Sequence, residues 1–162
     1  MTDFSAFYKR YASEVFRFAL YLSGERGEAE DITSETFVRV WASATQLELP
    51  TVKSYLFTIA RNLFLQGLRK RSRHVALTPE LPDSQPGLQA QIERQAELRA
   101  VLARLQKLPE IDRAALLLRT LDEMPYEEIA RVLDISVAAA KVKVHRARVK
   151  LEQVRAGQNS YE

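Results

Sequence analysis

Residues 126–151 read YEEIARVLDISVAAAKVKVHRARVKL, and their spacing is typical of a helix-turn-helix. Ile129 and Ala130 predict the inward face of a short first helix, and the alanine is small enough for a close helix crossing. Asp134 predicts the turn, because aspartate tolerates the left-handed backbone that such turns often need. Ser136 then predicts the start of a second helix, since serine is a favoured N-cap. The stretch therefore indicates two packed helices joined by a tight turn.

The second helix of this stretch separates an apolar stripe from a basic face. The inward stripe repeats at spacings of three and four residues and consists of Val137, Ala140, Val144, Ala147, Leu151 and Val154. The residues left outside include Lys141, Val142, His145, Arg146 and Arg148. Arginine and lysine can neutralise phosphates or donate to guanine, and Val142 can touch a thymine methyl. This helix is a candidate for reading the major groove; a solvated basic helix face is the alternative that the pattern leaves open.

Apolar periodicity near the N-terminus predicts three further helices. The first ends at Ser23-Gly24 and carries a stripe made of Phe4, Phe7, Tyr11, Val15, Phe18 and Leu22. The second starts with acidic residues, which helix N-termini favour, ends near Ala44 and directs inward Ile32, Phe37, Val40 and Trp41. The third starts near Thr51 and buries Leu56, Ile59, Leu63 and Leu68. These helices predict one compact bundle over residues 1–73.

Residues 74–91 interrupt the helical pattern. They hold three prolines and Gly87 but neither lysine nor arginine, which is typical of a flexible linker. Helical spacing then resumes, and residues 92–156 predict a second domain that contains the helix-turn-helix. Since no segment resembles a strand, the expected fold is all-α, with two small helical domains joined by the linker.

Composition excludes several classes of protein. The 162 residues include no cysteine and two histidines, and the sequence shows neither a glycine-rich phosphate loop nor a Ser-His-Asp arrangement. We therefore expect no enzyme, no catalytic residue, no metal site and no cofactor. No apolar run approaches the roughly 20 residues that span a bilayer, and the N-terminus lacks the layout of a signal peptide. A cytoplasmic protein without membrane insertion is expected.

The distribution of charge points to a polyanionic partner. The net charge is only +3, but residues 1–48 are rich in acidic side chains and two basic blocks follow. The first block consists of Arg61, Arg69, Lys70, Arg71 and Arg73, and the second of Lys141, Lys143, Arg146, Arg148 and Lys150. Two separated basic stretches indicate two contacts with nucleic acid, unless both are solvated helix faces.

Several motifs in a fixed order resemble those of extracytoplasmic-function sigma factors of the sigma-70 family. YEEIARVLDIS and KVKVHRARVKL, preceded by LARLQKLPEIDRAALLLRTLDEMP, resemble the domain that binds the promoter −35 element. AEDITSETFVRVW and SYLFTIARNLFLQGLRKRSR resemble the helices that bind core polymerase and the −10 element. The resemblance runs from about Phe4 to about Leu151 and leaves out only the linker.

This resemblance implies partners and site residues. The chain would bind promoter DNA and bacterial core RNA polymerase, including its β′ clamp helices and β flap, and an anti-sigma protein would sequester it. Core docking would fall on Glu30, Asp31 and Glu35. Contacts to the −10 element would fall on Tyr55, Arg61, Asn62, Arg69, Lys70, Arg71 and Arg73. Contacts to the −35 element would fall on Arg119, Lys141, Val142, Lys143, His145, Arg146 and Arg148.

The sequence departs from the family pattern at three places, which leaves the preferred promoter sequence open. Ser34 stands where the family usually has glutamine, and Ala138-Ala139-Ala140 replaces a common Gly-Thr-Val. The loop 43–50, which the family uses to choose its flipped base, is weakly matched. A regulator that binds an operator as a homodimer is the rival interpretation, and the ARN motif ending at Asn62 argues against it.

Overall fold

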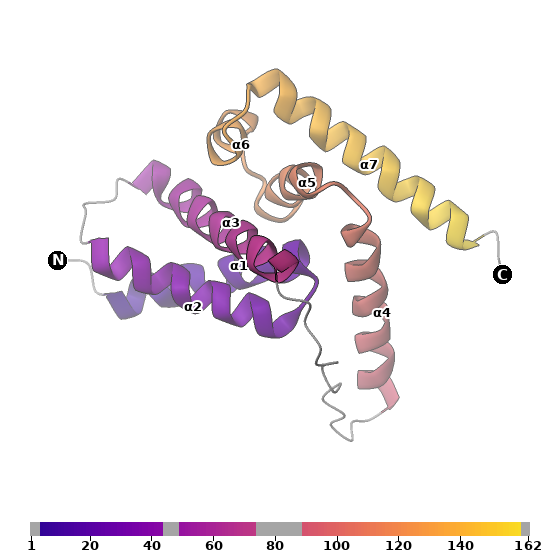
Figure 1. Ribbon diagram of the computed structural model, residues 1–162, viewed down its shortest axis with the longest axis horizontal. Coiled ribbons are helices and arrows are strands. Elements are labelled where there is room, and N and C mark those ends of the chain that lie inside the picture. The colour runs from indigo at the N-terminus through magenta and orange to yellow at the C-terminus, as the bar shows by residue number, and fades with distance from the viewer. Residues whose placement is uncertain (1–3, 44–48, 74–88, 160–162) are drawn as a thin grey trace.

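The computed structural model describes residues 4–43, 49–73 and 89–159, and all of its regular elements in these ranges are helices (Figure 1). They are α1 (Phe4–Ser23), α2 (Arg26–Ser43), α3 (Leu49–Arg73), α4 (Gln89–Gln106), α5 (Glu110–Asp122), α6 (Tyr126–Leu133) and α7 (Val137–Asn159). This confirms the all-α prediction. Most of the predicted linker lies outside the described residues, and its last three positions already belong to α4.

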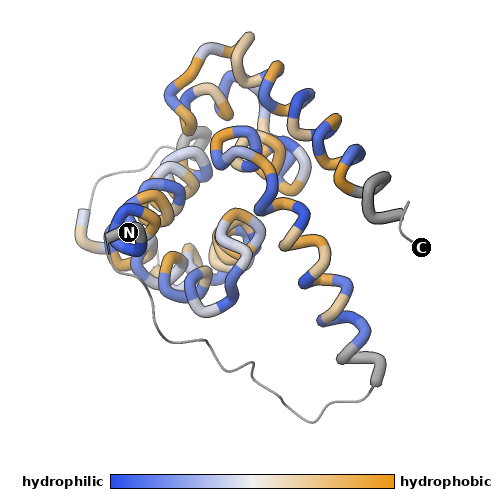
Figure 2. Tube along the Cα trace, turned by 45° about the vertical axis from the view of Figure 1, so that its right-hand side comes forward, coloured by the Kyte–Doolittle hydropathy of each residue, from blue (hydrophilic) through white to orange (hydrophobic). Residues whose placement is uncertain are grey.

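Helices α1, α2 and α3 pack as the N-terminal bundle, and hydrophobic positions alternate with hydrophilic ones along them (Figure 2). Its centre is the edge-to-face contact of Phe18 with Phe57, whose ring centroids lie 5.0 Å apart. Leu22 and Leu56 are buried beside them. A buried aromatic pair of this kind is worth about 0.5–1.5 kcal/mol beyond its area. The predicted stripe of α1 therefore faces the core.

Two residues that we expected in this core are exposed. Trp41 is 63% exposed, because it lies in the last turn of α2, where it makes an edge-to-face contact with the Phe4 ring, 4.5 Å away between centroids. Leu68 is 39% exposed, because it lies one turn beyond Phe64, the last buried residue described in α3. Helical spacing placed both side chains on the correct stripe but did not show where the core ends.

The helix-turn-helix has the predicted local geometry. Asp134 adopts the left-handed conformation, with φ of 55°, and ends α6. The Ser136 side chain caps α7, because its hydroxyl oxygen accepts a hydrogen bond from the Ala139 amide at 3.0 Å. Ala140, Val144 and Ala147 are buried on the inner face of α7. The inward stripe of α7 is thus confirmed at its centre, while Val137, Leu151 and Val154 are half-buried toward its ends.

The N-terminal bundle packs directly against the C-terminal helices. Helix α1 contacts α4 and α5, while α3 contacts α6, so the buried hydrophobic residues of both halves form one cluster. The guanidinium of Arg113 in α5 crosses this junction: its Nε donates to the Leu22 carbonyl at 2.9 Å and its Nη1 to the Leu108 carbonyl at 2.9 Å. Burial lowers the pKa of Arg113 from its ordinary value.

A second polar group is buried at the same junction. The side chain of Asp122, at the end of α5, is 1% exposed and neither of its oxygens has a hydrogen-bond partner. Arg17 of α1 lies 3.7 Å from it and donates instead to the Leu121 carbonyl at 3.1 Å. Glu14 and Lys53, which pair with each other at 3.2 Å, complete the surroundings. Burial raises the pKa of Asp122 to about 6.

We predict that Asp122→Asn stabilises the fold above neutral pH. Since the pKa in the folded chain is raised from its ordinary value of 3.8, the stability linked to Asp122 is present below pH 4 and is lost as the pH rises through 6. The variant should therefore melt higher at pH 8, by roughly 2–4 °C for each kcal/mol gained, and depend less on pH between 4 and 7. Thermal unfolding followed by circular dichroism measures this.

Asp31→Asn, at an exposed position of α2, is the control. An Asp122→Asn protein that melts lower than the parent at pH 8 would contradict the assignment.

Candidate nucleic-acid interface

The outer face of α7 presents cationic and apolar side chains together. His145, Arg146 and Arg148 are exposed, and Val142 is 51% exposed between them. Val142, His145, Arg146, Val149, Lys150 and Gln153 line one shallow groove along the helix. The groove continues beyond the residues predicted from the sequence, and the signal for this was the seven-residue spacing that places Val149 below Val142. Such a face can meet phosphates and thymine methyl groups at once.

Three helices contribute to a cluster at the start of α6. The Cζ atom of Arg119, in the last turn of α5, lies 4.7 Å from the centroid of the Tyr126 ring, and the Nζ atom of Lys141 lies 5.8 Å from it. Arg119 Nη1 also donates to the Met124 carbonyl at 3.2 Å. The structure thus brings two predicted contact residues together around Tyr126, which the sequence analysis missed.

Lys143 differs from the other predicted residues of α7. Its Nζ atom lies 3.8 Å from Asp112 Oδ1, and the two side chains are 21% and 2% exposed. The sequence position explains this, because Lys143 directly precedes buried Val144 on the side of α7 that packs on α5. The structure therefore places Lys143 apart from the outer face.

The predicted cations of α3 differ in their surroundings. Arg61 makes two hydrogen bonds of 2.8 Å with Glu110, at the start of α5, and is 13% exposed. Arg71 pairs with Glu28 of α2 and lies 3.9 Å from Glu25. Asn62, Arg69 and Lys70 are exposed, Tyr55 is half-buried against the core, and the Arg73 side chain lies outside the described residues.

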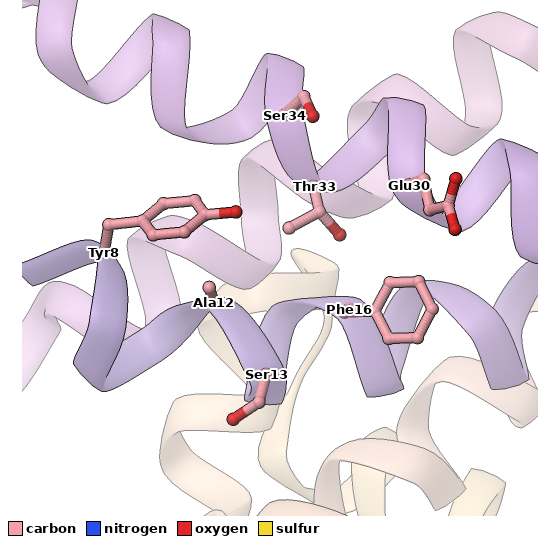
Figure 3. Close-up of a pocket in the computed structure, with 7 residues that line it drawn as sticks. All are labelled: Tyr8, Ala12, Ser13, Phe16, Glu30, Thr33 and Ser34. Carbon is pink, nitrogen blue, oxygen red and sulfur yellow. The ribbon is translucent and has the colours of Figure 1, made fainter.

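The acidic face of α2 borders a shallow pocket between α1 and α2 (Figure 3). Glu30, Asp31 and Glu35 are exposed; Glu30 pairs with Arg26 and Glu35 with Arg39, each at 3.3 Å. The pocket is lined by Tyr8, Ala12, Ser13, Phe16, Glu30, Thr33 and Ser34. On the same helix, the apolar side chains of Val38 and Trp41 are 59% and 63% exposed. Tyr8 and Val38 were not among the docking residues predicted from the sequence, and Trp41 was predicted to lie in the core.

Comparisons with known proteins identify the family. The family model "Sigma-70 region 2" matches residues 7–74, and "Sigma-70, region 4" matches residues 98–151. The chain is 34% identical to the ECF RNA polymerase sigma factor SigM of Bacillus subtilis, over 90% of each chain. It is also 34% identical to the ECF RNA polymerase sigma factor SigE of Mycolicibacterium smegmatis, over 99% of this chain and 64% of that protein. The chain belongs to the extracytoplasmic-function (ECF) sigma factors of the sigma-70 family.

A solved relative agrees with this ECF sigma-factor assignment. The sigma factor RpoE of Bartonella quintana, in complex with the anti-sigma factor NepR, superposes with a TM-score of 0.77 at 26% identity. The match covers 96% of this chain and 98% of that one. Region 2 contains the acidic α2 face and all of α3, while region 4 contains α5, α6 and the outer face of α7 as far as Leu151.

ECF sigma factors are transcription-initiation factors that bind DNA, not enzymes. Within the described residues of this one, no group of three or more histidine, aspartate or glutamate side chains could hold a metal ion. In the same ranges, no helix is long and apolar enough to cross a membrane.

Proposed function

We propose that this ECF sigma factor contacts its partners through three separate helices. The outer face of α7 reads the −35 element, α3 contacts the −10 element, and the acidic and apolar face of α2 docks on the β′ clamp helices of core polymerase in the cytoplasm. The observation that carries the proposal is the exposed face of α7, where Val142, His145 and Arg146 stand together on a capped helix of region 4. A helix of this kind in a helix-turn-helix enters the major groove.

The proposed −10 contact requires a rearrangement at the junction. Arg61 belongs to the ARN motif, yet its Nε and Nη2 atoms both donate to the Glu110 carboxylate. A bidentate pair with a carboxylate excludes a phosphate from the same guanidinium edge. We infer that α3 and α5 separate before Arg61 meets DNA, whereas exposed Asn62 is available without such a change.

The docking surface combines charge with apolar area. Exposed Glu30, Asp31 and Glu35 suit basic side chains on the partner, and Trp41 with Val38 supplies the apolar centre that protein interfaces favour.

The relative from Bartonella quintana is bound to an anti-sigma factor. By extension, we propose that an anti-sigma protein also sequesters this chain.

Reconstituted transcription tests the proposed function as a whole. The purified chain, mixed with core polymerase and genomic promoter fragments, should bind the polymerase one-to-one and direct initiation at defined start sites. Mapping of those sites would supply the −35 and −10 sequences. A chain that binds operator DNA as a homodimer, without affinity for the polymerase, would refute the proposal.

Arg146→Ala should weaken binding to a −35 duplex without changing affinity for core polymerase. Removing one base or phosphate interaction costs about 1–3 kcal/mol, or roughly five- to hundredfold in Kd. Fluorescence anisotropy with a labelled duplex measures the change. Arg99→Ala, at an exposed position of α4, removes the same charge away from α7 and should bind like the parent chain.

Glu35→Lys should weaken binding to core polymerase but not to the −35 duplex, the reverse of the result expected for Arg146→Ala. It reverses a charge on the proposed docking face, so affinity for core polymerase should fall by about tenfold or more, while binding to the isolated −35 duplex stays intact. Glu97→Lys on exposed α4 is the matched charge reversal. Equal loss of both activities in Glu35→Lys would indicate a damaged fold instead.

Glu110→Gln should release Arg61 for DNA. Because one more cation becomes available, binding to a single-stranded −10 oligonucleotide should tighten, and its dependence on log salt should steepen by about 0.7. Glu127→Gln removes the same charge from the first turn of α6, where Glu127 is exposed, and should leave the slope unchanged. Identical slopes for both variants would show that Arg61 does not reach the oligonucleotide.

A further inference from the structure

We propose that Tyr126 is a positioning residue: its ring holds Arg119 and Lys141 where they meet phosphates beside the −35 element. The proposal rests on the proposed −35 function of α7 and adds to it the support on which two of its cations depend.

The three side chains come from three helices and meet at one point. Arg119 is in the last turn of α5, Tyr126 is the first residue of α6, and Lys141 is in the second turn of α7. Pro125 precedes α6 with φ of −60° and ψ of 148°, and its ring fixes that φ at the point where the chain enters α6. In a helix-turn-helix the first helix crosses the DNA backbone and the second enters the groove. The cluster therefore lies where a phosphate would pass between α6 and α7.

The distances fit attraction between each cation and the ring. Arg119 Cζ and Lys141 Nζ lie 4.7 and 5.8 Å from the centroid, within the range of about 6 Å over which cation–π attraction acts. Two cations close to one another repel, and a ring that attracts both offsets this repulsion. Arg119 is held further by the bond from its Nη1 to the Met124 carbonyl. That bond uses one of its five donors, so the remaining donors stay available for a phosphate.

The support for these two cations differs in kind from the support of other cations in the chain. Arg61, Arg71 and Lys143 are each paired with a carboxylate, which cancels their charge. Across the described ranges, Arg119 and Lys141 take part in no ion pair with a carboxylate. A ring and a carbonyl fix a cation without neutralising it. Tyr126 thus orders two positive charges while leaving their full charge for DNA.

Two variants of Tyr126 separate the ring from the hydroxyl. Tyr126→Leu removes the ring, and the Kd for a −35 duplex should rise roughly tenfold, because neither cation is then held in place by cation–π attraction. The log–log salt slope should become shallower by about 0.9 for each phosphate that the variant no longer neutralises. Tyr126→Phe keeps the ring face and should bind like the parent chain. Thermal unfolding of both variants shows whether the helix-turn-helix remains folded.

A double-mutant cycle then tests whether Tyr126 acts through the cations. In a chain carrying both Arg119→Ala and Lys141→Ala, the further change Tyr126→Leu should cost nothing. Without DNA, the Arg119 Nε–H resonance should lie upfield in the parent chain, because the ring shields it, and should move downfield in Tyr126→Leu.

The contrary results have distinct meanings. If Tyr126→Phe binds as weakly as Tyr126→Leu, the hydroxyl contacts DNA directly and the positioning role is overturned. If Tyr126→Leu weakens binding in the double-alanine chain as it does in the parent, the ring acts independently of the cations and the proposal is also overturned. If the double-alanine chain binds like the parent while Arg146→Ala does not, the inference fails and the proposed function stands. If neither weakens binding, the −35 face itself is misassigned.

Discussion

One buried guanidinium connects the two halves of the molecule. The last carbonyl groups of an α-helix have no partner within the helix and carry the negative end of its dipole. Arg113 donates to the Leu22 carbonyl, near the end of α1, to the Leu105 carbonyl in the last turn of α4 at 3.5 Å, and to Leu108 just beyond it, so that one side chain reaches the ends of two helices. Gln106 adds a second donor to the Leu22 carbonyl at 3.1 Å. The packing of α1 against α4 and α5 therefore includes two hydrogen bonds to the Leu22 carbonyl that neither half can make by itself.

The same junction constrains the residue that follows α1. Gly24 has φ of +77°, and a Cβ atom at this position would lie 2.9 Å from the Gln106 side-chain nitrogen. A larger residue would strain the backbone and displace the glutamine that helps Arg113. Closing the two halves in this way brings Glu110 to Arg61. The arrangement that completes the core thus also occupies a cation of the proposed −10 surface, and opening it would leave the Leu22 carbonyl without its Arg113 donor.

Much of the fold, but less of the site, was predictable from the sequence. The stripe of α1, the turn at Asp134, the Ser136 cap and the inner face of α7 follow from local periodicity and side-chain chemistry, which act within one helix. Trp41 was expected inside but is exposed, and Lys143, predicted as a −35 contact, is paired with Asp112; both outcomes depend on where a neighbouring helix ends or packs. The roles of Arg113 and Asp122 depend on contacts between residues far apart in sequence, and periodicity gives no information about these. The linker stays a prediction.

The structure also shows what the departure at Ala138–Ala140 changes. Ala140 is fully buried, so its methyl group replaces a valine inside the domain and not at the groove. Ala139 is half-buried and its amide is already bonded to Ser136, so the start of α7 keeps its cap without the threonine. The hydroxyl that the family places there is nevertheless missing, and alanine offers no hydrogen bond in its place. If α7 reads the −35 element as proposed, direct readout rests on Val142, His145 and Arg146, one to two turns further along the helix. In that arrangement a methyl contact from Val142 and donors from Arg146 would suit a site in which thymine and guanine are close neighbours.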